Sequence, residues 1–233
     1  MYFELRITVL VKQTTHHLQI QEHIGKWISR AQLGDPYFKQ AHYDGAYKHY
    51  VFSSLYPIEK DGVYQSGRAY ILTIRSSRQD TLSRINACMR SCREDDYFQF
   101  VSSDQRTKKL PHITEMITIT SAIVTIDHKP WVHENNIELL VKQLHANAEK
   151  KFKHLYPDEQ MEPFQPFIQG IRVENRKPIA TSYKGRKLLG NKFRLFINED
   201  DYSQKLANIV LGSGLAEKGS SLGSGFCLAK CIE

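Results

Sequence analysis

The order in which hydrophobic periods follow one another in the first half constrains the fold of this chain most. Residues 2–11 alternate apolar and polar side chains, as a half-buried strand does, whereas residues 18–31 place apolar side chains three and four apart, as an amphipathic helix does. The next expected elements are strands at 47–55 and 69–74, a helix at 80–93 and a short strand at 98–102. This order predicts a ferredoxin-like unit, in which two helices cover one face of a four-stranded antiparallel sheet.

The second half follows the same order of elements without a detectable repeat of the sequence. Its expected elements are a strand at 113–127, a helix at 135–155, strands at 167–173, 180–188 and 192–197, a helix at 202–211 and a closing strand at 225–230. We expect 167–173 and 180–188 to pair as a hairpin around 175–178. The fold class is therefore α+β, with two tandem ferredoxin-like units at 1–107 and 108–233.

Positive charge favours a polyanionic partner. The chain has 32 Lys and Arg against 25 Asp and Glu, a formal net charge of +7, and each contact between a cation and a phosphate releases counterions. The basic side chains of the second half that are candidates for contacting the phosphates of such a partner are Lys184, Arg186, Lys187, Lys192 and Arg194. Strand alternation would place Lys184 and Arg186 on one face. The alternative is a solvated hairpin that charge keeps soluble, and Tyr183 is either a base-stacking or a half-buried strand residue.

Other features limit the class of protein. The apolar runs fall short of the roughly 20 residues that span a membrane, and the first residues lack the basic head and apolar centre of a signal peptide, so we expect a cytoplasmic protein without a membrane partner. The cysteines form two separated pairs, Cys88 with Cys92 and Cys227 with Cys231, which favours reduced thiols over a disulfide scaffold. We predict no metal site and no cofactor.

A glycine-rich stretch, GSGLAEKGSSLGSGF at 212–226, lies between the last expected helix and strand. Glycine permits positive φ and lets backbone N–H groups approach phosphate, with Lys218, Ser220 and Ser221 as further RNA-binding candidates. The stretch resembles the C-terminal glycine-rich loop of the repeat-associated RNA-binding superfamily. It departs from that pattern at Ala216, where a glycine is usual, and at Ser224, where an apolar residue is common.

A second segment, YFKQAHYDGAYK at 37–48, narrows the resemblance to the Cas six (Cas6) endoribonucleases. It is similar to the segment in which that family places a catalytic histidine and, shortly afterwards, a lysine. The resemblance implies that His42 moves the proton and that Lys48 stabilises charge on the phosphate. The nearest competing histidines are His17 and His49.

Several family members complete the site with a tyrosine from the first helix, but the comparable turn here holds Trp27 and Ser29. Tyr37, Tyr43 or Tyr47 could take over that role. We name Tyr43 as the third candidate because it adjoins His42.

The resemblance implies a metal-independent endoribonuclease that recognises CRISPR repeat RNA. Its nucleophile would be the ribose 2′-hydroxyl, and its products a 2′,3′-cyclic phosphate and a 5′-hydroxyl. The implied partners are repeat RNA, guide RNA and other subunits of a CRISPR surveillance complex. The alternatives are a non-catalytic RNA-binding subunit of such a complex and, from another class, a protein-interaction subunit whose basic face meets RNA only incidentally.

Overall fold

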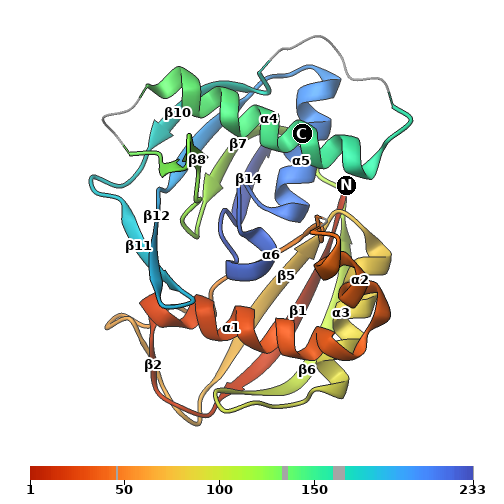
Figure 1. Ribbon diagram of the computed structural model, residues 1–233, viewed down its shortest axis with the longest axis vertical. Coiled ribbons are helices and arrows are strands. Elements are labelled where there is room, and N and C mark those ends of the chain that lie inside the picture. Colours follow the sequence, from red (N-terminus) through yellow and green to blue (C-terminus); the bar gives the residue numbers. More distant parts are fainter. Residues whose placement is uncertain (46, 133–135, 160–165, 233) are drawn as a thin grey trace.

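The computed structural model describes residues 1–45, 47–132, 136–159 and 166–232. The main elements of the first half are β1 (Tyr2–Val11), α1 (His17–Ala31), β3 (Tyr50–Phe52), β5 (Ala69–Ser76), α3 (Gln79–Ser91) and β6 (Phe98–Lys108). The short elements between them are β2 (Thr15–His16), the 3-10 helix η1 (Gln32–Gly34), α2 (Pro36–Tyr43) and β4 (Val63–Tyr64). The strands β3, β5, β1 and β6 form one antiparallel sheet in that order, of which Figure 1 labels the last three.

The second half builds a sheet of the same topology. Its main elements are β7 (His112–Thr118), α4 (Ile137–Leu155), β10 (Ile168–Val173), β13 (Phe193–Ile197), α5 (Asp201–Ser213) and β14 (Cys227–Ile232), and the sheet runs β10-β13-β7-β14. The additional elements are β8 (Thr125–Ile126), β9 (Lys129–Pro130), β11 (Ile179–Tyr183), β12 (Arg186–Gly190) and α6 (Gly219–Leu222). Two tandem ferredoxin-like units with antiparallel sheets are therefore confirmed.

The expected pairing of the second hairpin is wrong. Strand β10 pairs with β13, not with β11, and β11 pairs with β12 through a turn at Lys184 and Gly185. Both turn residues have positive φ, 49° and 74°, which matches the right-handed twist of a two-residue hairpin. Lys184 thus lies in the turn rather than on one strand face with Arg186.

The strand expected at 113–127 is also too long. Strand β7 ends at Thr118, and the residues that follow turn toward the glycine-rich stretch. The Thr120 hydroxyl donates to the Gly223 carbonyl at 2.6 Å and accepts from the Phe226 N–H at 2.8 Å. Isolated bridges of Ala122 with Asn191 and of Ile123 with Glu217 then follow in place of a continuous strand. The helix expected from 135 begins at Ile137, and residue 135 lies outside the described residues.

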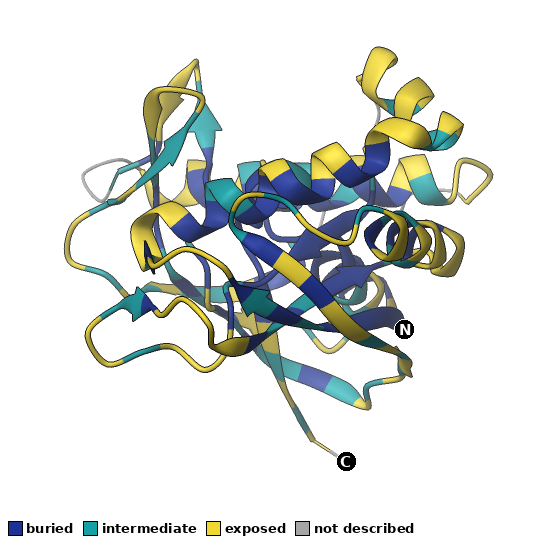
Figure 2. Ribbon diagram, turned by 90° about the horizontal axis from the view of Figure 1, so that it is seen from below, coloured by how far each residue is buried: buried dark blue, intermediate teal, exposed yellow. Residues whose placement is uncertain are grey.

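Each sheet has its own apolar core, and the helices alternate buried and exposed faces (Figure 2). On α1 the predicted stripe is buried: Ile20, Ile24, Trp27, Ile28 and Ala31. Cys88 lies on α3 and Cys227 and Cys231 on β14; all four thiols are free. In the described parts of the chain no His, Cys, Asp and Glu side chains gather in a metal-binding group of three, and no helix is long and apolar enough to cross a membrane.

The two units are joined by a buried charge on the first sheet. Arg75 of β5 is 7% exposed and donates to Glu4 at 2.9 Å and to the Cys227 carbonyl at 2.6 Å. Its guanidinium also lies over the Phe226 ring, 4.4 Å from the centroid. Because the bonds reach both sheets, Arg75 fixes the end of the glycine-rich stretch against the first unit.

Candidate active site

A cleft with a volume of about 620 Å³ lies where the units meet. Helices α1 and α2 form one wall, and the β11–β12 hairpin and α6 form the other. The hairpin extends from the upper unit to α1 of the lower one (Figure 1), where the Lys184 N–H donates to Glu22 at 3.2 Å. The first unit contributes His42, Tyr43 and Lys48 to the cleft and the second contributes Lys184, Lys218, Ser220 and Ser221.

His42 lies in the last turn of α2. This helix begins at Pro36, a residue suited to a first helical position, and Asp35 caps it by accepting from the N–H groups of Tyr37 and Phe38. The His42 side chain is exposed, and no described residue forms a hydrogen bond with its imidazole. Both ring nitrogens are therefore available to a ligand in the cleft.

Lys48 lies deeper in the same cleft, and its ammonium group has a neutral partner. The Nζ atom donates to Gln32 Oε1 at 3.2 Å, and the Gln32 amide is held in turn by the buried Tyr50 hydroxyl at 3.1 Å. Burial lowers the pKa of Lys48 from its ordinary value. No carboxylate among the described residues pairs with Lys48, so its charge can be matched by an anion from outside.

Gln32 is a site residue that the sequence did not indicate. It is 3% exposed, ends the α1 region and lines the cleft. Its contacts with Lys48 and Tyr50 span 16 and 18 residues of sequence. No local sequence pattern predicts either contact, because a glutamine that follows a helix is common in proteins.

The tyrosine candidates separate in space. Tyr43 is 79% exposed, and its ring centroid is 6.4 Å from that of His42. The Tyr37 hydroxyl is 3.4 Å from the Thr81 hydroxyl, and Tyr47 lies beside His49 and His154. On α1, Trp27 is fully buried in the core, whereas Ser29 lines the cleft.

The competing histidines lie outside this cleft. His49 is 4% exposed, and its Nε2 is 2.7 Å from Nδ1 of His154 on α4. Burial lowers the pKa of His49 to about 3, so it stays neutral at cellular pH. His17 lies at the start of α1, with Nδ1 3.2 Å from the Gly62 carbonyl.

The structure divides the predicted basic residues into groups. Lys184 and Lys218 reach the cleft, where their ammonium groups lie 5.5 and 5.8 Å from the Tyr183 ring centroid. Arg186 and Lys187 are exposed on β12, and Lys192 lines a different pocket. The cleft therefore receives only part of the predicted set.

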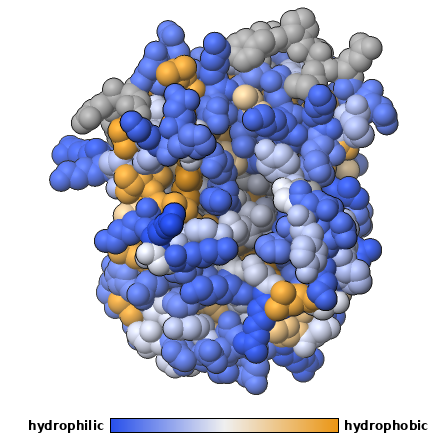
Figure 3. All heavy atoms as spheres, in the orientation of Figure 1, coloured by the Kyte–Doolittle hydropathy of each residue, from blue (hydrophilic) through white to orange (hydrophobic). Residues whose placement is uncertain are grey.

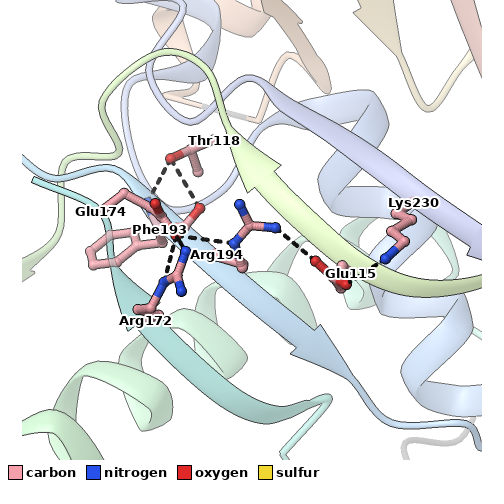
Figure 4. Close-up of polar contacts among 7 residues, drawn as sticks. All are labelled: Glu115, Thr118, Arg172, Glu174, Phe193, Arg194 and Lys230. Atoms are coloured by element: carbon pink, nitrogen blue, oxygen red, sulfur yellow. Dashed lines mark hydrogen bonds and ion pairs between the residues drawn. The ribbon is translucent and has the colours of Figure 1, made fainter.

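Arg194 is engaged elsewhere, on the outer face of the second sheet. It donates to Glu115 at 2.8 Å and to Glu174 at 3.0 Å (Figure 4). Arg172 also donates to Glu174, and Lys230 also donates to Glu115. This ladder of alternating charges links β10, β13, β7 and β14. Arg194 thus has two carboxylate partners of its own.

The glycine-rich stretch uses its backbone for packing. The N–H groups of Gly214, Gly223 and Gly225 donate to the carbonyls of Val210, Gly219 and Ser121. All three glycines have positive φ, and a Cβ on Gly225 would lie 2.0 Å from the Leu215 carbonyl oxygen. The expectation that these glycine N–H groups meet phosphate is therefore wrong, because they are already bonded inside the protein.

A buried lysine holds the stretch from behind. Lys151 on α4 is 4% exposed and donates to the Gly214 carbonyl at 2.6 Å and the Ala216 carbonyl at 2.9 Å. Burial lowers the pKa of Lys151 to about 7. Lys218, Ser220 and Ser221 are thereby presented to the cleft on a fixed support.

Comparisons with known proteins agree with this architecture. A curated protein of Methanocaldococcus jannaschii, named CRISPR-associated endoribonuclease Cas6 2, is 24% identical over 245 aligned residues, which cover 95% of this chain and 97% of that protein. A solved structure titled CRISPR associated protein Cas6 superposes with a TM-score of 0.72 at 17% identity, covering 99% of this chain and 100% of the other.

A second solved structure is titled an RAMP protein binding different RNA substrates. It superposes with a TM-score of 0.72 at 16% identity and covers 98% of this chain and 99% of its own. No protein-family model matches the chain. The sequence similarity to the curated Cas6 protein extends over almost the full length of both chains, and the chain shares the fold of the solved Cas6 structure.

Proposed function

We propose that the protein is an endoribonuclease that recognises CRISPR repeat RNA and cuts precursor transcripts into guide RNAs. The curated relative is named a CRISPR-associated endoribonuclease, and one structural neighbour is described as binding RNA. The observation that carries the proposal is the cleft itself, which contains an unpaired imidazole and an ammonium group without a carboxylate partner among the described residues. Cleavage of a phosphodiester by the neighbouring ribose hydroxyl uses both kinds of group, one to transfer a proton and one to stabilise negative charge.

In the proposed reaction the 2′-oxygen attacks the adjacent phosphorus and the bond from phosphorus to the 5′-oxygen breaks. His42 takes the proton of the 2′-hydroxyl or returns a proton to the leaving 5′-oxygen, because an imidazole nitrogen can accept a proton and, once protonated, donate it. Lys48 balances the negative charge that accumulates on the phosphate oxygens. The products are a 2′,3′-cyclic phosphate and a 5′-hydroxyl, and the reaction needs no metal ion.

In this proposal the RNA contacts both units, residues 1–107 and residues 108–233. Lys184 and Lys218 contact phosphates near the cut, Ser220 and Ser221 donate to the same backbone, and Tyr183 offers a ring between the two ammonium groups. Arg186 and Lys187 extend the positive surface along the hairpin. Tyr43 adjoins His42 and takes the role of the tyrosine that orients it. A protein that keeps its RNA product bound would serve as a subunit of a CRISPR surveillance complex.

The test uses labelled repeat RNA from the same genome, with a chelator present. We compare the natural protein with His42→Asn and with His128→Asn, a control on an exposed turn outside the cleft. His42→Asn is expected to slow cutting by about a hundredfold or more while leaving affinity within about twofold, as for loss of a general acid or base. The control is expected to cut normally.

Three results would contradict parts of the proposal. Tight binding of repeat RNA without a cut by the natural protein would leave a non-catalytic RNA-binding subunit. Equal cutting by His42→Asn and the natural protein would remove His42 from the mechanism, and loss of cutting in chelator would remove metal independence.

A further inference from the structure

A second pocket of about 400 Å³ lies on the other side of the hairpin contact. Apolar side chains provide much of its lining: Leu18, Ile58, Tyr64, Ile119, Ile179 and Leu222. Three of them remain accessible, with Leu18 47%, Ile58 68% and Ile119 39% exposed. Hydrophobic side chains also gather around the β11–β12 hairpin on the surface drawn in Figure 3.

The same three elements line this pocket and the active-site cleft. On β11, Ile179 and Thr181 line the pocket, and Tyr183, two residues further on the same strand face, lines the cleft. On α6, Ser221 faces the cleft and Leu222 the pocket. Helix α1 likewise borders the pocket with its first turns and the cleft with its later ones. A single extended chain can therefore reach both.

Gln21 of α1 is the unusual member of the lining. Its side chain is buried, with 8% of the residue exposed, and neither Nε2 nor Oε1 has a hydrogen-bond partner among the described residues. Buried amides nearly always have partners in folded proteins. Rotation of the terminal amide of Gln21 toward the pocket it lines would satisfy both atoms if the occupant offered an acceptor next to a donor.

Charge limits the chemistry of the occupant. No carboxylate of the described residues lines the pocket, whereas Lys192 does, and none of the described Asp or Glu side chains pairs with its ammonium group. Apolar walls, an amide and one free cation together match a nucleotide, since a base has flat apolar faces and adjacent donors and acceptors on its edge, and its phosphate is an anion.

We propose that this pocket holds one unstacked base of the RNA whose backbone lies in the active-site cleft, with Gln21 bonding the base edge and Lys192 the adjoining phosphate. The inference rests on the proposed function, because it takes RNA as the ligand. It adds a point at which the sequence of the repeat is read away from the cut.

The experiment measures the affinity of a set of repeat RNAs, each lacking one base but keeping its backbone. The proteins compared are the natural one, Gln21→Leu, and the matched control Gln19→Leu, an exposed glutamine on the same helix outside both cavities. For the natural protein and the control, we expect removal of the base at one position to weaken binding by about tenfold, the value of a specific base contact. Gln21→Leu is expected to bind the intact repeat about tenfold more weakly and to be insensitive to base removal at that position.

Thermal unfolding checks that Gln21→Leu is folded, and its melting temperature is expected to equal or exceed that of the natural protein because an unpaired buried amide has been removed. If Gln21→Leu weakens every RNA of the set by the same factor, or responds to base removal as the control does, the pocket does not read a base. Such a result, together with normal cutting of the repeat, overturns this inference and leaves the proposed function intact. A natural protein that binds no repeat RNA overturns both.

Discussion

At the scale of single residues, the neutral partner of Lys48 distinguishes this site. A carboxylate in the place of Gln32 would hold the ammonium group equally well but would cancel much of its field at the phosphate. The amide orients Lys48 and leaves its charge available. Gln32 is thus a positioning residue, and the buried Tyr50 hydroxyl fixes its amide.

Substitution of Gln32 tests this role. Gln32→Leu removes the oxygen that holds Lys48 and is expected to lower the rate of single-turnover cutting by about tenfold, with RNA affinity nearly unchanged. Gln32→Glu is expected to weaken RNA binding as well and to raise the pH at which cutting declines on the alkaline side, because a carboxylate favours the charged form of Lys48. Rates and affinities measured across pH separate the two effects, with the exposed Gln40→Leu as control. Unchanged rates in both variants would exclude a positioning role.

Sequence reasoning predicted His42 and Lys48 through a local segment, and both line one cleft. It could not predict Gln32, whose contacts depend on how η1 returns toward β3. The basic residues show the same limit. Charge can be counted along the chain, but the carboxylates that engage Arg194 come from outside its own strand.

At the scale of elements, the contact between α1 and α6 separates the active-site cleft from the second pocket. Gly25, in the middle of α1, faces Ser221 so closely that a Cβ would lie 2.3 Å from the Ser221 carbonyl oxygen. A glycine inside a helix costs stability relative to alanine. Here it permits the close approach that positions Ser221.

Gly25→Ala should therefore reverse the usual sign of a glycine-to-alanine change in a helix. We expect a loss of about 1–3 kcal/mol in the free energy of unfolding, as for overpacking of a tight contact, rather than the usual gain of about 0.5–1 kcal/mol. Urea unfolding measures the change. Gly34→Ala is the control, because a Cβ added there would meet open space within 4 Å and its φ is not positive. A stabilised Gly25→Ala variant would show that the helices separate easily.

The order of the main elements was predictable because each period of apolar residues is local. Which strands pair with each other in the second unit was only partly predictable. The turn-forming residues at 175–178 suggested a hairpin, whereas the actual turn, Tyr183-Lys184-Gly185-Arg186, carries its own signal in the glycine at its second central position. Because β10 pairs with β13, which is distant in sequence, the hairpin forms at the second of these turns and not at 175–178.

At the scale of the whole molecule, two histidines connect the units beside the cleft. His49 precedes β3 and His154 lies near the end of α4, and their rings share a hydrogen bond of 2.7 Å. Burial, the neighbouring His154 and nearby cations lower the pKa of His49 to about 3 from 6.5. The folded protein therefore binds fewer protons at this residue than the unfolded chain between these pH values.

The sign of the effect follows from proton binding. The contribution of neutral His49 to stability is complete above pH 6.5 and is lost as the pH falls from 6.5 toward 3, by about 1.4 kcal/mol per pH unit. His49→Asn keeps a residue that tolerates the positive φ of 50°. Between pH 6.5 and 5 it is expected to lose about 2 kcal/mol less stability than the natural protein in urea unfolding. His128→Asn should follow the natural protein, and parallel curves for all three would exclude His49 as an acid-sensitive group.

The cleft described above belongs to neither unit alone, since α1 and α2 form one wall and the hairpin and α6 the other. Each half nevertheless has a core built mainly from its own residues, with Tyr2 of β1 packed into the core of the second half. Recombination between relatives at the junction of the halves would therefore give chimaeras that fold and yet present mismatched walls to RNA. The halves can accumulate changes in their cores independently, but along the cleft they must be inherited together.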